Sequence, residues 1–160
     1  MTHHRLTKGL AARALAACLA LVVWAGIVVA AEPELSKTSG GLTVYLGVIP
    51  AEIVKGLPLH AAEKPMHGRI PRGPHEFHVV AALFDAASGT RVSDAVVTAQ
   101  VSGLGLAGSK KKLEPMRIEG TTTYGAFFTL PGRDLYTVKL SVERPGAARP
   151  VTFEFKYDHR

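Results

Sequence analysis

The sequence predicts an all-β protein: an immunoglobulin-like antiparallel β-sandwich of about seven strands, preceded by an N-terminal signal or anchor helix. Short runs of alternating apolar and polar residues recur along the chain, and Gly and Pro residues separate them. No segment after residue 31 has the apolar spacing expected of an amphipathic helix. The expected strands are residues 42–49, 77–84, 95–101, 111–119, 122–130, 135–142 and 151–157.

The N-terminal segment predicts export. Basic residues precede an unbroken apolar run over residues 14–31, which ends in the small residues Val-Ala-Ala that a signal peptidase accepts. The apolar run is close to the roughly 20 residues that span a bilayer, so an uncleaved membrane anchor is the alternative. We expect residues 1–31 to be a cleaved signal peptide and the mature protein to be periplasmic.

Composition limits the classes of function. The net charge is +6, but the basic residues before the apolar run contribute three of these charges and the others are scattered, so nucleic-acid binding is not indicated. Cleavage would remove Cys18, the only cysteine, and with it any disulfide or thiolate metal ligand. Residues 32–41 are expected to form a polar leader, and residues 42–160 are long enough for one domain.

A Pro/Gly-rich loop at residues 50–76 is the most informative part of the chain. Its composition opposes both a helix and a central strand. Long ordered loops in compact domains are usually functional. Imidazole, thioether and carboxylate groups, which copper and iron sites use, are concentrated in this loop and directly after it. These candidate metal ligands are His60, Glu63, Met66, His67, His75 and His78.

Met116 supplies another thioether, from the opposite half of the domain. Because a thioether suits copper(I) and a carboxylate suits copper(II) or iron, the mixture predicts a copper or iron site that accepts both oxidation states. We expect the loop to fold over the sheet edge and to bring His67 or His78 within about 8 Å of Met116. Surface polarity without a bound metal is the alternative.

Three motifs resemble enzyme sites, but their neighbouring residues, residue order or spacing differ from what those sites require. The run Gly-x-Gly-x-x-Gly at residues 103–108 follows a strand, but Pro115 prevents the helix that would bind phosphate, so we expect a hairpin loop. The following Gly-Ser-Lys at residues 108–110 reverses the order of a phosphate-binding loop. His75 and His78 are three apart in an extended run and point to opposite faces, unlike a zinc-protease pair. The sequence therefore predicts no enzyme.

Several segments of the mature chain match the patterns of one known family. The most specific is Leu-Glu-Pro-Met at residues 113–116, followed by Tyr-Gly-Ala at residues 124–126, and Glu63 with His67 matches a Glu-x-x-x-His segment. In these segments the chain resembles the periplasmic iron-transport proteins, copper-binding immunoglobulin-like antigens that accompany a high-affinity iron permease. Further matches are residues 44–46, 49–52, 71–73, 79–83, 88–89 and 153–157.

This resemblance implies a metal site that includes Glu63, His67 and Met116, together with a homodimer and an inner-membrane permease partner. Two family histidines are absent: Thr123 stands where one of them precedes Tyr-Gly-Ala, and a tight turn replaces the insertion that carries the other. The candidate replacements are His60, Met66, His75 and His78.

The expected function is a periplasmic, non-catalytic protein that binds copper or iron and acts in iron uptake or copper handling, with an inner-membrane iron permease or copper transporter as its partner. The first alternative is a metal-free interaction or assembly module tethered to the inner membrane. A metalloenzyme is the second, but it would need a general base and a substrate cleft beside the metal, and the sequence shows no such group.

Overall fold

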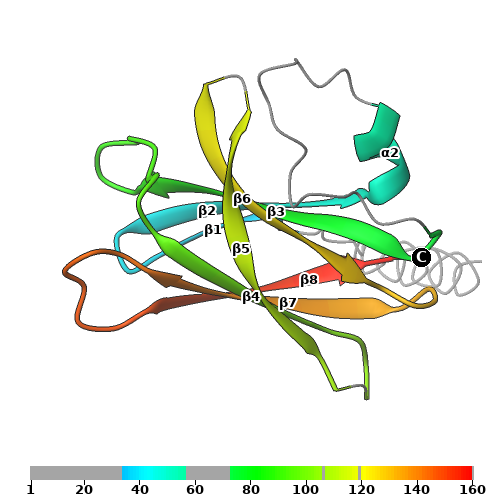
Figure 1. Cartoon of the computed structure of the whole chain (residues 1–160). Helices are drawn as coiled ribbons and strands as arrows, with labels where there is room; N and C mark the ends of the chain where they lie inside the picture. The colour runs from blue at the N-terminus through cyan, green and yellow to red at the C-terminus, as the bar shows by residue number, and fades with distance from the viewer. Residues whose placement is uncertain (1–33, 57–72, 106, 119, 160) are drawn as a thin grey trace, which may run out of the picture. The chain divides into compact units, whose positions relative to one another are not determined.

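Eight antiparallel strands and one short helix make up the part of the chain that the computed structural model describes, residues 34–56, 73–105, 107–118 and 120–159. The helix is α2 (Ala51–Gly56), and the strands are β1 (Ser36–Ser39), β2 (Leu42–Pro50), β3 (Glu76–Asp85), β4 (Val96–Ser102), β5 (Ser109–Ile118), β6 (Thr121–Thr129), β7 (Leu135–Glu143) and β8 (Val151–Asp158). Their spatial order is β1-β2-β3-β6-β5-β4-β7-β8 (Figure 1). The predicted antiparallel all-β sandwich is confirmed, with one strand more than expected.

Strand β5 passes from one layer of the sandwich to the other. Residues 109–113 pair with β4, whereas residues 114–118 pair with β6. The first sheet therefore contains β1, β2, β3, β6 and the end of β5, and the second contains the start of β5, β4, β7 and β8 (Figure 1). Pro115 lies just after the switch, where β5 pairs with β6 alone, so its missing N–H can face the open side of the strand.

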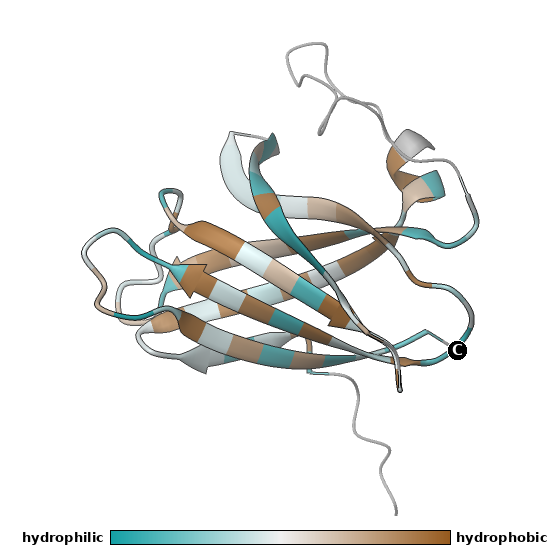
Figure 2. Ribbon diagram, turned by 60° about the horizontal axis from the view of Figure 1, so that its bottom comes forward, coloured by the Kyte–Doolittle hydropathy of each residue, from teal (hydrophilic) through white to brown (hydrophobic). Residues whose placement is uncertain are grey.

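The main core lies between the two sheets and follows the period of two along the strands. In β7, Tyr136, Val138, Leu140 and Val142 are buried, and the residues between them are exposed or partly exposed. Figure 2 shows the same alternation as apolar and polar bands along the ribbons. This pattern is the signal from which the strands were predicted, and it explains why their bounds agree with the structure to within two residues.

Two buried tyrosines are held by hydrogen bonds to the backbone. The Tyr136 hydroxyl donates to the carbonyl oxygen of Pro131 at 2.7 Å, five residues upstream, as a tyrosine corner does in immunoglobulin-like folds. The Tyr124 hydroxyl accepts a hydrogen bond from the backbone N–H of Ala95 at 3.0 Å, which connects β6 to the segment that enters β4. Burial raises the pKa of both phenols, so both hydroxyls stay protonated at neutral pH.

The structure adds two elements that the sequence analysis did not predict. Residues assigned to the polar leader form β1, which joins β2 through a two-residue turn at Gly40 and Gly41, with φ of 56° and 74°. The prediction that residues 50–76 contain no helix is wrong for α2. Pro50 directly precedes this helix and Gly56 ends it, so the helix breakers lie at its boundaries rather than inside it.

Two predicted segments lie mainly outside the described residues. Residues 1–33 include the expected signal peptide or anchor helix, so that assignment stays a prediction. Within the described ranges, no helix has the length and apolar character needed to cross a membrane. Residues 57–72, the middle of the expected Pro/Gly-rich loop, also lie outside the described part; the structure shows only how this loop begins, in α2, and how it ends, at β3.

Candidate metal centre

The first sheet has a buried region on its outer face, in addition to the main core on its inner face. Successive residues of a strand point to opposite faces, so Val79 of β3 enters the main core and His78 points outward. His78 is nevertheless only 2% exposed. On the same outer side, Ala51 and Val54 of α2 pack against Phe127 of β6 in a second apolar cluster.

Strand β6 holds the imidazole of His78. The register partner of His78 on β6 is Phe127. Their rings stack with centroids 4.5 Å apart and an angle of 24° between planes. Phe127 also packs against α2, so both β6 and α2 hold the ring that stacks on His78. In this arrangement the Nε2 atom of His78 lies beside Gly125.

Met116 approaches the same place from β5. It is 5% exposed, and its register partner on β6 is Thr123. A Cβ atom built on Gly125 would lie 2.6 Å from His78 Nε2 and 3.1 Å from Met116 Sδ. Both atoms are thus within 3.1 Å of one point above Gly125, which places them closer together than the about 8 Å expected from the sequence. The expected distance is confirmed for His78, which β3 positions, whereas the expected path of the loop lies mainly outside the described residues.

Gly125 provides the space that the two side chains share. Its φ is not among the positive values of this chain, so backbone freedom does not explain the glycine. Glycine inside a strand is usually unfavourable, and it often marks a site where another group approaches closely. Any side chain here would collide with the imidazole or the thioether. An imidazole nitrogen and a thioether sulfur that face one confined space match the ligands that copper accepts.

The structure brings together only part of the predicted ligand set. Among the described residues, no three His, Cys, Asp or Glu side chains form a group that could hold a metal ion, so a site here depends on the methionine as well. His75 is exposed in the turn before β3, unlike the buried pair. Four other candidates lie outside the described residues and stay predictions: His60, Glu63, Met66 and His67.

Two residues at this site were missed by the sequence analysis. Gly125 was noted only as part of a family motif, and Glu114 was not selected as a ligand. Glu114 lies two positions before Met116 in β5, so both point to the same face, and its register partner is Gly125. The spacing of two between a carboxylate and a thioether in a predicted strand was the signal that could have identified Glu114.

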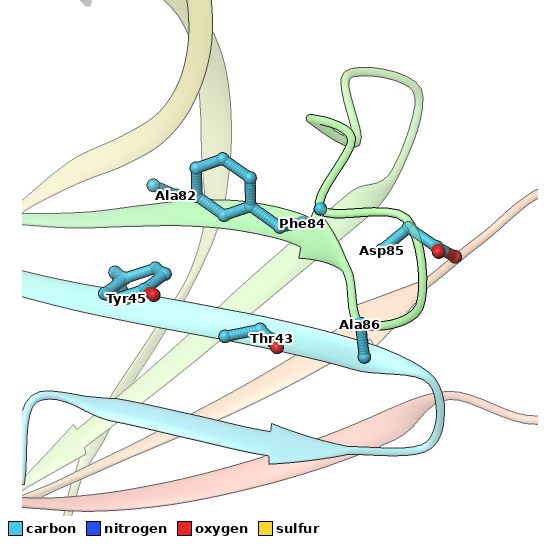
Figure 3. A pocket seen from close by; sticks show the side chains of 7 residues that line it. Thr43, Tyr45, Ala82, Phe84, Asp85 and Ala86 are labelled. Carbon is cyan, nitrogen blue, oxygen red and sulfur yellow. The ribbon is translucent and has the colours of Figure 1, made fainter.

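A second concave region lies where β2 and β3 meet the turn after β3 (Figure 3). It has a volume of about 540 Å³, and its lining residues are Thr43, Tyr45, Ala82, Phe84, Asp85, Ala86 and Gly89. Tyr45 and Phe84 pack edge to face with ring centroids 5.5 Å apart, and Tyr45 is 51% exposed. These lining residues include no imidazole or thioether.

The fold and the buried pair together define a β-sandwich with a candidate copper centre on the outer face of one sheet. No family model and no curated protein matches the sequence. Solved structures do match its fold. A copper-bound variant of FetP from uropathogenic Escherichia coli strain F11 is 14% identical, with a TM-score of 0.59 over 81% of this chain and 95% of that chain.

Two further structures show the same architecture. The copper-reconstituted P19 protein from Campylobacter jejuni is 12% identical, with a TM-score of 0.57 over 78% of this chain and 92% of that chain. A DUF4426 family protein from Pseudomonas aeruginosa PAO1 is 21% identical, with a TM-score of 0.54 over 78% of this chain and 96% of that chain. At these identities the likeness establishes the fold, and the site must be argued from the residues of this chain.

Proposed function

We propose that this protein is an exported, non-catalytic copper-binding protein, and that His78 and Met116 hold the ion on the outer face of the first sheet. The observation that carries this proposal is the convergence of the imidazole nitrogen and the thioether sulfur above Gly125. Imidazole and thioether both suit copper, whereas a thioether contributes little to binding zinc or magnesium. The pair therefore favours copper over iron, the other metal expected from the sequence.

Burial of the pair is consistent with a site that holds copper away from water. The rings of His78 and Phe127 are stacked, and α2 packs against Phe127, so the imidazole is positioned before any ion arrives. Ligands that are already positioned lose less entropy on binding, which raises affinity. Two of the structures with the same fold contain copper, which supports the choice of metal. The N-terminal apolar segment supports a periplasmic location. A transporter in the inner membrane is the partner that the family resemblance implies.

Equilibrium dialysis of the mature domain against copper(I), copper(II) and iron(II) tests the proposal. We expect copper to bind, and we expect Met116→Ile and His78→Gln each to weaken copper(I) binding at least about tenfold. His159→Gln is the control, since it removes an imidazole that is not a candidate ligand and that follows β8 in the second sheet. Thermal unfolding of each variant shows whether the domain is still folded.

Other results of this experiment would reject the site. Copper binding that is equally strong in the wild type, Met116→Ile and His78→Gln would place the ion elsewhere. The absence of copper binding would instead favour a metal-free interaction module, and the apolar region beside Tyr45 and Phe84 would then be the surface to examine (Figure 3).

A further inference from the structure

We propose that Glu114 is a third ligand of this site and that its carboxylate extends binding from copper(I) to copper(II). This inference rests on the proposed copper site at His78 and Met116, and it assigns a role to a residue of the Leu-Glu-Pro-Met segment that was not selected as a ligand from the sequence. It concerns the oxidation state of the bound ion, which His78 and Met116 alone do not determine.

The register of the first sheet places Glu114 beside the shared space. Gly125 lies between Val80 of β3 and Glu114 of β5 in one row across three strands. Directly opposite residues in an antiparallel pair have Cβ atoms about 4.5–5.5 Å apart. The Glu114 Cβ is therefore about that far from the point that His78 Nε2 and Met116 Sδ both approach. A glutamate carboxylate lies two bonds beyond Cβ, so it can reach this point.

Two independent relations put Glu114 on the correct face. It is the register partner of Gly125, and opposite partners in a ladder point to the same side of the sheet. It also lies two residues before Met116, whose sulfur is known to be on that side. On the other side of Gly125 the row continues through Val80 of β3 to Gly47 of β2, and neither residue has a polar side chain. The row therefore offers one carboxylate.

Exposure distinguishes Glu114 from the other two ligands. His78 and Met116 are buried, whereas Glu114 is exposed. A buried, uncompensated carboxylate would cost several kcal/mol, so an exposed position lets the metal-free protein keep this charge in water. The described ion pairs are Arg144–Asp85 and Lys156–Glu154, and neither involves Glu114. The carboxylate thus remains available at the edge of the space above Gly125.

The chemistry of the three groups explains the expected effect. A thioether is a soft ligand that stabilises copper(I), and imidazole serves both oxidation states of copper. A carboxylate is a hard, charged ligand that compensates the extra charge of copper(II). Removing the carboxylate should therefore weaken copper(II) binding more than copper(I) binding. Removing the thioether should do the reverse.

The test compares Glu114→Gln with Met116→Ile and with Glu143→Gln. Glu143 is an exposed carboxylate at the end of β7 in the second sheet, so Glu143→Gln changes the net charge equally at a distant place. Competition titrations give the copper(I) and copper(II) affinities, and electron paramagnetic resonance of the copper(II) form reports its ligands directly. We expect Glu114→Gln to lower the copper(II) affinity at least about tenfold, with a smaller change for copper(I) and an altered resonance spectrum.

The outcomes separate this inference from the proposed function. If Met116→Ile weakens copper(I) binding but Glu114→Gln leaves the ratio of the two affinities and the spectrum unchanged, the copper site stands and the role of Glu114 is rejected. The role is also rejected if Glu143→Gln reduces copper(II) binding as much as Glu114→Gln does, because the effect would then be one of net charge. If neither Met116→Ile nor His78→Gln weakens copper binding, the proposed function itself is rejected.

Discussion

On the outer face of the second sheet, Gln100 and Lys139 are exposed and form part of a shallow polar depression of about 200 Å³. On the outer face of the first sheet, His78, Met116 and Phe127 are all buried. Both faces belong to the same sandwich, and the strand alternation that builds the core is the same. A sandwich needs burial only between its sheets, so burial on an outer face requires an additional element. Here α2 contributes to that burial, because it packs against Phe127, whose ring stacks on His78.

The largest effect should come from removing the ring that connects α2 to His78. We expect Phe127→Ala to lower the free energy of unfolding by about 3 kcal/mol, because a buried ring is lost and a cavity remains. Gln100→Ala, on the outer face of the second sheet, should change it by less than about 0.5 kcal/mol. Urea unfolding of both variants measures the difference. Equal changes in the free energy of unfolding would mean that side chains on the two outer faces contribute equally to stability.

Filling the space above Gly125 should reduce both copper binding and stability, whereas an equally crowded glycine substitution elsewhere should reduce stability alone. Gly125→Ala and Gly47→Ala each introduce a Cβ only 2.6 Å from a neighbouring side-chain atom, His78 Nε2 in the first case and Val80 Cγ2 in the second. Both should lower the free energy of unfolding by about 1–3 kcal/mol through overpacking.

Only Gly125→Ala should also abolish the copper site, because its new methyl group displaces both donor atoms. Isothermal titration with copper(I), alongside the unfolding measurements, distinguishes the two variants. Loss of copper binding in Gly47→Ala, or normal binding in Gly125→Ala, would contradict the assignment of the space.

The smallest effect concerns the exposed end of β3, far along the strand from His78. Asp85 accepts hydrogen bonds from the backbone N–H and the hydroxyl of Ser88, at 3.0 and 2.9 Å, and these hold the pKa of its carboxyl below the ordinary value near 3.8. Folding therefore favours the charged form, and this contribution is present above the unfolded pKa and is lost as the pH falls through the folded pKa.

Asp85→Asn should therefore destabilise the domain slightly at pH 7, and the difference from the wild type should shrink toward pH 3. Thermal unfolding at several pH values measures this change, and copper binding at pH 7 should be unaffected. If the stability difference between Asp85→Asn and the wild type grew as the pH fell, the charged form of Asp85 would not be the form that stabilises the fold.

Most strands were predictable because each carries the period of two that a half-buried strand requires. β1 was not, since its sequence Ser-Lys-Thr-Ser has no apolar residue and its pairing is visible only through the turn at Gly40 and Gly41. α2 was missed because its apolar contacts are only Ala51 and Val54, too few for a periodic signal. In both cases the stabilising contacts lie outside the element itself, in the adjacent β2 for β1 and in the distant Phe127 for α2.

The site was predictable in its ligand types but not in its arrangement. Met116 and His78 were selected because thioether and imidazole are uncommon enough to stand out in sequence. The roles of Gly125 and Glu114 depend on strand register, and the register depends on β5 leaving β4 for β6 near Pro115. No local pattern encodes which strand becomes the neighbour of another, so these two residues required the structure.

X-ray absorption at the copper edge tests the central claim most directly, because it detects sulfur bound to the metal. The chain after residue 31 contains two sulfur atoms, those of Met66 and Met116. The account predicts a sulfur neighbour at about 2.3 Å in the copper(I)-loaded mature domain, retained in Met66→Ile and lost in Met116→Ile. A copper(I) spectrum without sulfur, or one that Met116→Ile leaves unchanged, would contradict it.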